Sequence, residues 1–255
     1  MSEALADLTE DAFLGGQLRL KQKRSGHRAG HDAILLAAAT EASAGDRVVD
    51  LGAGIGTAGL ALARRVAGIR LGLVEIDPEL AELARANATA NAIAAETIVL
   101  DVTADAQAFA ASGLAPDSVD VVLMNPPFND PARHRGSPDQ VRQIAHVATD
   151  ETLNAWVHAA RRILRSHGAL TLIWRADGIA EVLAGLSRGF GSLAILPVHG
   201  EAGRPAIRVL VRAVKGGRAP ARLLPGLVLT EESRVPKEVM DILEGRAVLP
   251  LVEPC

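Results

Sequence analysis

Apolar runs of strand length alternate with helical patterns of hydrophobic residues between residues 47 and 214. The runs that predict strands cover residues 47–51, 70–75, 97–100, 119–124, 169–173, 193–196 and 208–214. The helical patterns between them cover residues 60–66, 78–91, 153–163 and 179–186. This alternation is typical of an α/β fold with a mostly parallel sheet of seven strands and helices on both faces. A loop joins the last two strands, so we expect the last strand to be antiparallel.

Capping residues mark the ends of two of these helices. Asp77 precedes Pro78, which predicts an N-cap followed by proline in the first helical turn. Asp150 is the expected N-cap of the helix at residues 153–163, and Gly168 is expected to close it.

The chain is expected to divide into three parts around the sheet. Residues 1–45 form a leader, residues 46–215 form the core, and residues 216–255 form a C-terminal extension packed on the core. Within the extension, the apolar positions predict a strand at residues 227–230 and a short helix at residues 237–243. Ligands of such sheets bind beyond the carboxyl ends of the strands, so the chemistry is expected there.

Composition narrows the class of protein. The chain has 255 residues, of which 49% are hydrophobic, enough for one sizeable core. The longest stretch without Lys, Arg, Asp or Glu is residues 51–63, shorter than the roughly 18 residues of a membrane span. The start of the chain is acidic, unlike a signal peptide, and the single cysteine is Cys255. We therefore expect no disulfide, no membrane span and a cytoplasmic location.

The charge is unevenly distributed. The chain has 27 basic and 30 acidic residues, yet residues 19–28 and residues 204–222 contain bases and no acid. Such clusters can follow a phosphate backbone on a protein that is acidic elsewhere. The alternative is two solvated faces with no partner.

A glycine-rich turn follows the first predicted strand, where the sequence reads Asp50-Leu-Gly52-Ala-Gly54-Ile-Gly56. Glycine lets the backbone approach a ligand closely because it lacks a Cβ. A dinucleotide loop has the spacing Gly-x-Gly-x-x-Gly, whereas here Thr57 occupies the position of the third glycine. The spacing therefore favours a nucleoside ligand without a pyrophosphate over a dinucleotide.

Three acids come at the ends of three consecutive predicted strands: Asp50, Glu75 and Asp101. Glu75 is placed to accept hydrogen bonds from both hydroxyls of a ribose, and Asp101 to meet an adenine amino group. The third carboxylate, that of Asp50, suits the positive charge of a sulfonium. Together the three acids favour S-adenosylmethionine as the cofactor, against the alternative of an ordinary tight turn at the glycines.

The fourth predicted strand ends in Asn125-Pro126-Pro127-Phe128. Two prolines make the turn stiff and remove N–H donors, so the corner presents oxygen atoms. The Asn125 side-chain oxygen and the Pro126 carbonyl can accept the two protons of an exocyclic amino group and free its lone pair for methylation. Phe128 offers a flat face on which a flipped base can stack. The chain has few aromatic residues, so one directly after Asn-Pro-Pro is not expected by chance. A strand-ending turn with a packed Phe is the structural alternative.

The region that follows this corner is rich in basic residues. Arg133, His134 and Arg135 come soon after Phe128. They could clamp the phosphates that flank a flipped base, or belong to a surface loop without a function.

These motifs together resemble the class I amino-group methyltransferases, which have a Rossmann-like S-adenosylmethionine fold and an (Asn/Asp)-Pro-Pro-(Phe/Tyr/Trp) motif. More closely, residues 18–230 resemble the bacterial family of tRNA1(Val) adenine-37 N6-methyltransferases. The resemblance implies methylation of N6 of adenine at tRNA position 37, with tRNA as the partner. It does not settle the oligomeric state.

The leader carries the rest of this resemblance, in the segment Lys21-Gln22 … His27-Arg28-Ala-Gly30-His31-Asp32. The corresponding segment of the family contacts the methionine end of the cofactor. By that match Arg28, Gly30 and Asp32 are candidates for the methionine pocket, where an Arg can pair with the carboxylate and an Asp with the ammonium. His31 departs from the small or apolar residue expected at its position.

The candidate catalytic residues are Asn125, Pro126, Pro127 and Phe128. The candidate cofactor-binding residues are Arg28, Gly30, Asp32, Asp50, Gly52, Ala53, Gly54, Gly56, Glu75, Ile76, Asp101, Val102 and Asn125. The candidate RNA-binding residues are Lys21, Lys23, Arg24, Arg133, Arg135 and Arg204.

Several alternatives stay open at this stage. The Asn-Pro-Pro-Phe motif also suits guanine N2 in rRNA and glutamine N5 in a release factor. A non-catalytic RNA-binding module is a further possibility, although the intact Asp50, Asn125 and Phe128 argue against it. His27 and His31 are four residues apart without a third ligand nearby, so no metal site is expected.

Overall fold

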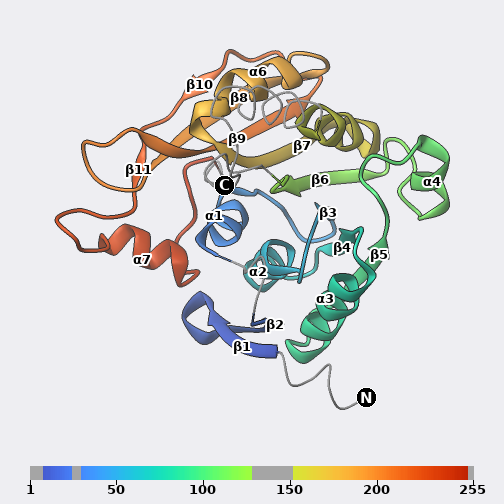
Figure 1. Cartoon of the computed structure of the whole chain (residues 1–255). Helices are drawn as coiled ribbons and strands as arrows, with labels where there is room; N and C mark the ends of the chain where they lie inside the picture. The colour runs from blue at the N-terminus through green and yellow to red at the C-terminus, as the bar shows by residue number, and fades with distance from the viewer. Residues whose placement is uncertain (1–7, 25–29, 128–151, 252–255) are drawn as a thin grey trace, which may run out of the picture.

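The computed structural model describes residues 8–24, 30–127 and 152–251. The central sheet is built from β3 (Arg47–Leu51), β4 (Arg70–Glu75), β5 (Ala95–Val99), β6 (Val119–Met124), β7 (Leu164–Arg175), β8 (Phe190–His199), β9 (Ala206–Lys215), β10 (Arg222–Leu223) and β11 (Leu227–Val228). The strands lie in the order β10-β8-β9-β7-β6-β3-β4-β5, and β11 also pairs with β8 (Figure 1). The helices are α1 (His31–Ala39), α2 (Thr57–Arg65), α3 (Pro78–Ala90), α4 (Ala106–Ala111), a helix through residues 152–163, α6 (Ile179–Leu186) and α7 (Lys237–Leu243).

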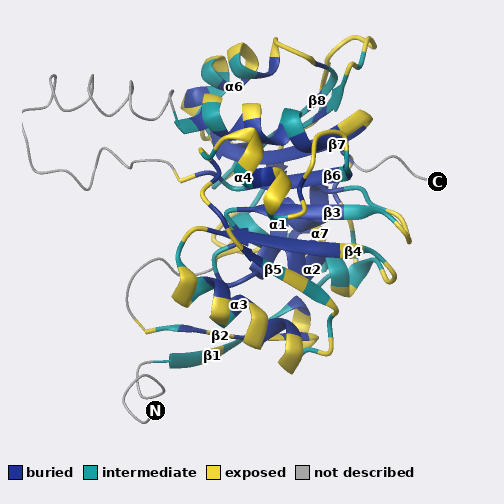
Figure 2. Ribbon diagram, turned by 90° about the vertical axis from the view of Figure 1, so that its right-hand side faces the viewer, coloured by how far each residue is buried: buried dark blue, intermediate teal, exposed yellow. Residues whose placement is uncertain are grey.

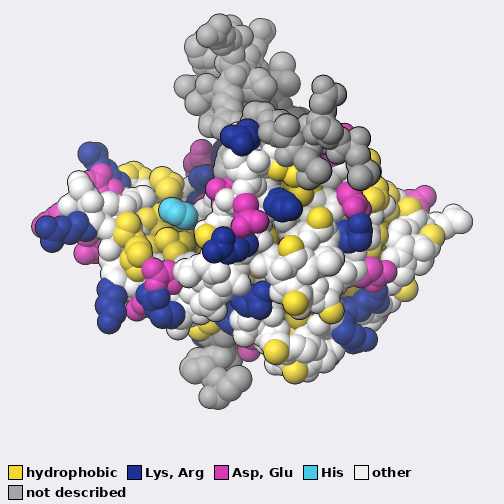
Figure 3. Space-filling model, turned by 90° about the horizontal axis from the view of Figure 1, so that it is seen from below, with side chains coloured by type: hydrophobic (Ala, Val, Ile, Leu, Met, Phe, Trp, Pro, Cys, Tyr) yellow, Lys and Arg dark blue, Asp and Glu magenta, His cyan; other side chains and the backbone are white. Residues whose placement is uncertain are grey.

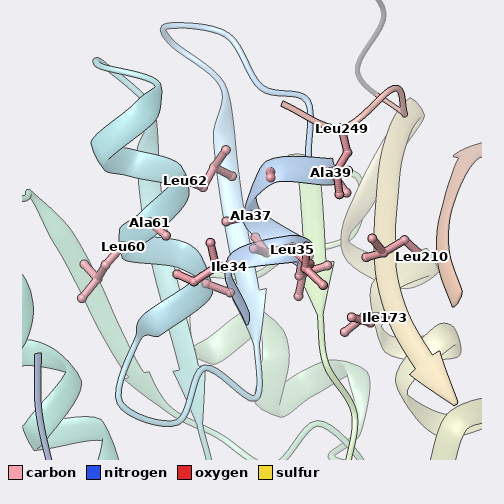
Figure 4. Close-up of a cluster of buried hydrophobic side chains, with 14 of the residues drawn as sticks. Ile34, Leu35, Ala37, Ala39, Leu60, Ala61, Leu62, Ile173, Leu210 and Leu249 are labelled. Carbon is pink, nitrogen blue, oxygen red and sulfur yellow. The ribbon is translucent and has the colours of Figure 1, made fainter. Parts of the chain in front are cut away.

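Hydrophobic side chains on the two faces of the sheet form two separate cores. Because successive residues of a strand point to opposite faces, Val48 joins the core under α1 and α2, while Val49 joins the core under α4 and the helix through residues 152–163. Figure 4 shows the first core, in which Leu35 of α1 and Leu60 of α2 lie over the sheet. The predicted α/β fold with helices on both faces is therefore confirmed.

The order of the strands reverses beside β3. This strand pairs in parallel with β4 on one side and with β6 on the other, and β6 comes later in the chain. The carboxyl ends of β3 and β6 thus open onto a topological switch point, where open α/β sheets bind their ligands.

Within the described residues the sheet has nine strands, two more than the seven expected in the core. The seven predicted strands are all present, and β9 is antiparallel to both β7 and β8, as expected. The additional strands, β10 and β11, come from the C-terminal extension and pair in parallel with β8. The run predicted at residues 227–230 is β11. A two-residue strand such as β10 is too short to show an alternating pattern.

One helix end was predicted wrongly. The helix through residues 152–163 passes directly into β7 at Leu164, so Gly168 lies inside a strand and does not close the helix. A Cβ on Gly168 would lie 2.9 Å from the carbonyl oxygen of Asp120. The backbones of β6 and β7 approach each other so closely here that only a residue without a side chain fits. The predicted N-cap Asp150 lies outside the described residues.

The leader contains a hairpin that the sequence analysis missed. Strands β1 (Leu8–Phe13) and β2 (Leu18–Lys23) form a separate antiparallel sheet below α2 and α3 (Figures 1 and 2). Leu18 and Leu20 of β2 are fully buried. The hairpin therefore packs against the same hydrophobic core as α1 and α2.

The C-terminal extension also packs on the leader. Val239 and Ile242 of α7 are buried in the same core as α1, and the N–H of Leu249 donates to the carbonyl of Ala38 at 3.0 Å. The division into leader, core and extension stays a prediction. Within the described ranges, every helix is too short or too polar to cross a bilayer.

Candidate active site

The glycine-rich turn joins β3 to α2 at the switch point. Gly52, Gly54 and Gly56 have φ angles of 69°, 56° and 89°, in the left-handed region that glycine adopts without strain. Apart from its chain neighbours, no atom in the described part of the chain lies within 4 Å of the place where a Cβ on Gly54 would sit, so this part of the turn faces open space. A ligand at the edge of the sheet can therefore approach the backbone there.

Trp156 supports the opposite side of the same turn. A Cβ on Gly52 would lie 2.1 Å from Cη2 of Trp156, so only glycine allows the indole ring to pack there. Trp156 is buried in the hydrophobic core. Its contact with Gly52 shows that it also fixes the path of the turn.

Asp50 is buried beneath the turn. Its Oδ2 accepts a hydrogen bond from the N–H of Gly59 at 2.8 Å. Burial raises the pKa of Asp50 to about 7, with a further increase from the charge of Glu75, although the Gly59 hydrogen bond acts in the opposite direction. Gly59 was not recognised from the sequence. A Cβ there would lie 3.1 Å from the Asp50 Oδ2. The predicted helix began only at residue 60, whereas α2 begins at Thr57, so Gly59 lies within the helix.

Glu75, at the end of β4, is buried and holds two turns together. Its Oε2 accepts from the N–H of Gly54 at 2.8 Å, and its Oε1 accepts from the N–H of Asp77 at 3.0 Å. The next residue, Ile76, is 60% exposed, unusual for an isoleucine, and lies at the same edge of the sheet. Together Glu75 and Ile76 present a carboxylate and an apolar surface side by side.

Asp101 follows β5 by two residues and is exposed. Its Oδ1 accepts from both the backbone N–H and the hydroxyl of Thr103, at 2.7 and 2.8 Å. Val102 is buried. The three predicted acids therefore do lie at the carboxyl ends of neighbouring strands.

The corner after β6 presents a buried acceptor. Among the residues that the structure describes, the Oδ1 of Asn125 has no hydrogen-bond partner, which is unusual for a buried polar atom. Pro126 is buried and Pro127 is exposed. Phe128 lies outside the described residues. The asparagine thus offers a free oxygen next to the glycine-rich turn, since β6 pairs directly with β3.

The leader reaches the same edge at the start of α1. Gly30 precedes the helix, and apart from its chain neighbours no atom of the described residues lies within 4 Å of the place where a Cβ on it would sit. Asp32 forms an ion pair with Arg208 of β9 at 2.9 Å, so its carboxylate is shared with the sheet. Arg28 lies outside the described residues.

The candidate RNA-binding residues differ in their exposure and in their ion pairs. Lys21 and Arg24 are exposed on the leader, whereas Lys23 pairs with Glu79 at 2.7 Å and Arg204 lies 3.8 Å from Glu201. Arg133 and Arg135 lie outside the described residues.

Part of the basic run at residues 204–222 is used inside the fold. Arg212 pairs with Glu41 at 2.9 Å, and Lys215 pairs with Asp117 at 2.8 Å. Figure 3 views the molecule from below, and there basic side chains are scattered among acidic ones. Over the ranges that the structure describes, no group of acidic, His or Cys side chains could hold a metal ion.

Comparison with known proteins identifies the family. The family model described as Methyltransferase small domain matches residues 31–200. The tRNA1(Val) (adenine(37)-N6)-methyltransferase of Porphyromonas gingivalis (strain ATCC BAA-308 / W83) is 32% identical over 176 residues, 68% of each chain. The release factor glutamine methyltransferase of Chlorobaculum tepidum is 27% identical over 168 residues, 64% of this chain and 56% of that protein.

A solved structure is similar over nearly its whole length. The crystal structure of a predicted O-methyltransferase, protein Atu636 from Agrobacterium tumefaciens, is 33% identical. It superposes with a TM-score of 0.71 and covers 86% of this chain and 98% of that one. The matched region includes the glycine-rich turn, the three acids and the Asn125 corner. The chain therefore belongs to the Methyltransferase small domain family, which confirms the Rossmann-like fold and the S-adenosylmethionine-dependent methyltransferase class expected from the sequence.

Proposed function

We propose that the chain transfers a methyl group from S-adenosylmethionine to N6 of adenine at position 37 of a tRNA. The observation that carries the proposal is the buried Oδ1 of Asn125 at the switch point of the sheet, which no donor of the described residues pairs with. An acceptor held there without a partner suits a substrate that brings two N–H donors. The printed activity of the Porphyromonas gingivalis relative supports the choice of adenine in tRNA.

The residues around the turn fit the cofactor. Gly54 faces open space against which a nucleoside can lie, and Glu75 has remaining acceptor capacity for ribose hydroxyls. The exposed Ile76 offers an apolar surface for the adenine ring, and Asp101 an acceptor for its amino group. The proposed cofactor-binding set is the predicted one: Arg28, Gly30, Asp32, Asp50, Gly52, Ala53, Gly54, Gly56, Glu75, Ile76, Asp101, Val102 and Asn125.

The Asn125 corner prepares the target nitrogen for attack. Its Oδ1 accepts one amino proton and the Pro126 carbonyl accepts the other, which draws the lone pair out of conjugation with the ring. Each such hydrogen bond contributes about 1–3 kcal/mol, and in-line placement of the reacting atoms contributes more. The bound sulfonium supplies a methyl group that is already electrophilic, so no base is needed first. With the cofactor bound, methyl transfer would form the nitrogen–carbon bond as the sulfur–carbon bond breaks, and the amino group held by Asn125 and Pro126 would release one proton to solvent.

The RNA is held by base stacking and by phosphate contacts. Phe128 stacks on the flipped adenine, and Lys21, Lys23 and Arg24 of the leader contact phosphates. Arg133, Arg135 and Arg204 complete the proposed RNA-binding set.

A second candidate keeps the chemistry and changes the substrate. The Chlorobaculum tepidum relative is named as a glutamine methyltransferase, and a glutamine amide also brings two N–H donors to Asn125. We rank it second because that relative is less similar and is matched over a smaller share of its length.

The test supplies the purified protein with labelled S-adenosylmethionine and either bulk RNA lacking the modification or a release factor. Mass spectrometry then identifies the methylated product. N6-methyladenosine in tRNA supports the proposal, whereas label only in the protein substrate supports the second candidate.

Asn125→Ala tests the role of the corner. Loss of one acceptor that acts in the transition state is expected to lower kcat about 100-fold or more, a larger effect than the loss of cofactor affinity in the same variant. Single-turnover methyl transfer and a cofactor titration measure the two quantities. Unchanged methyl transfer in this variant would refute the acceptor role of Asn125.

A further inference from the structure

Strand β2 of the leader hairpin docks on α3 through the side chains of two asparagines. Asn91 accepts from the N–H of Arg19 at 3.0 Å and donates to the Arg19 carbonyl at 2.7 Å. Asn87 accepts from the N–H of Lys21 at 2.8 Å and donates to the Lys21 carbonyl at 3.0 Å. Each side-chain amide thus bonds the strand as a neighbouring backbone amide would.

The spacing of the two asparagines matches the spacing of the strand. Four residues along a helix advance about 6 Å, and two residues along a strand advance about 6.7 Å. Asn87 and Asn91 can therefore meet alternate residues of β2. This pairing satisfies backbone groups at the edge of β2 that faces away from β1, an edge that would otherwise be open.

Asn87 differs from Asn91 in its burial and in its second acceptor. It is only 1% exposed, and its Nδ2 also donates to the carbonyl of Ile55 at 3.1 Å, whereas the Nδ2 of Asn91 also donates to the carbonyl of Asn87 at 2.8 Å. Ile55 lies between Gly54 and Gly56 in the glycine-rich turn. The side chain of Asn87 thus holds the leader and the turn at the same time.

The two elements held by Asn87 both lead to the candidate site. On one side of Ile55, the N–H of Gly54 is bound by Glu75. On the other side, β2 ends at Lys23, from which the chain continues to Gly30 and α1. The ion pair of Lys23 with Glu79 fixes the end of β2 to the first turn of α3. The hydrogen bonds of Asn87 to Lys21 and Ile55 therefore fix the position of the leader relative to the glycine-rich turn.

We infer that Asn87 is a positioning residue, which sets the geometry of the glycine-rich turn and of the leader for the cofactor without touching it. This inference rests on the proposed cofactor site. Asn91 docks the hairpin in the same way but does not bond the turn, so it offers a matched control.

The experiment compares Asn87→Ala with Asn91→Ala in the full chain. Both variants lose hairpin contacts and should melt at a lower temperature than the wild type. Only Asn87→Ala should raise the Kd for S-adenosylmethionine, by about fivefold or more in a calorimetric titration. At saturating cofactor its kcat should stay within about twofold of the wild-type value, so that the loss falls on KM for the cofactor.

A second variant and a second measurement cover the case in which Asn87→Ala does not fold. Asn87→Ser removes less volume, and amide hydrogen exchange of residues 53–57 reports the turn directly. Faster exchange there in the Asn87 variant than in Asn91→Ala supports the inference. Equal effects of the two variants on Kd and on exchange would overturn it. Failure of the wild-type protein to bind the cofactor would instead refute the proposed function.

Discussion

Asp50 shows how a single buried carboxyl group makes stability depend on pH. Its pKa is raised from 3.8 to about 7, mainly by burial. Between these values the folded protein keeps a proton that the unfolded chain has lost, so stability falls as pH rises through this range. Above pH 7 the cost of the buried charge is fully present. The fold therefore tolerates this cost in order to hold a carboxylate beneath the glycine-rich turn.

Asp50→Asn is accordingly expected to stabilise the protein at pH 8. The variant keeps an oxygen for the N–H of Gly59 but carries no charge. We expect a gain of about 1–3 kcal/mol, because relief of charge burial is partly offset by an added amide NH₂ that lacks a partner. Urea unfolding of both proteins at pH 4 and pH 8 measures the gain, which should shrink towards the lower pH. A difference that is the same at both pH values would contradict the explanation.

At the scale of elements, a helix or strand boundary was predicted correctly where residues close to it in the sequence determine it. Asp77 and Pro78 set the start of α3, and Asp77 accepts hydrogen bonds from the N–H groups of Glu79 and Leu80 as an N-cap does. The β1–β2 hairpin was missed because its second partner is α3, through Asn87 and Asn91, and no local pattern shows such a contact. Gly168 was misread because its cause is the approach of a distant carbonyl.

The candidate site was predictable to a similar extent. Asp50, Glu75 and Asn125 follow or end apolar strands, and parallel topology brings such ends together without further information. The ion pair of Asp32 with Arg208 joins residues 176 positions apart, which the sequence alone could not show.

The packing of the helix through residues 152–163 on the glycine-rich turn leads to a prediction for Gly52→Ala. Its Cβ would clash with Trp156 and its φ of 69° would strain any other residue, so we expect a loss of about 2–4 kcal/mol. Gly54→Ala is the control, because it has a similar φ but open space, and should cost only about 1 kcal/mol. Chemical unfolding measures both. If the two variants lose equal stability, the clash with Trp156 is not the cause.

At the scale of the whole molecule, net charge opposes RNA binding, since the chain carries a formal charge of −3. RNA can still bind if it contacts only a locally basic surface. The structure shows which basic side chains are exposed and which are paired with acids. Arg212 and Lys215 are neutralised by acids from other elements, whereas Lys21 is exposed on β2. The leader is therefore the part of the described chain that we expect to contribute most to phosphate contacts.

Lys21→Ala tests this expectation through the dependence of RNA affinity on salt. Each phosphate contact on single-stranded or duplex RNA contributes about 0.7–0.9 to the slope of log Kd against log salt concentration. Loss of Lys21 should therefore lower the slope by about that amount and weaken binding to different RNA sequences equally. Arg85→Ala is the control, because Arg85 is also exposed but pairs with Glu82 on α3. A slope that changes as much in Arg85→Ala as in Lys21→Ala would mean that overall charge, and not the leader, governs RNA binding.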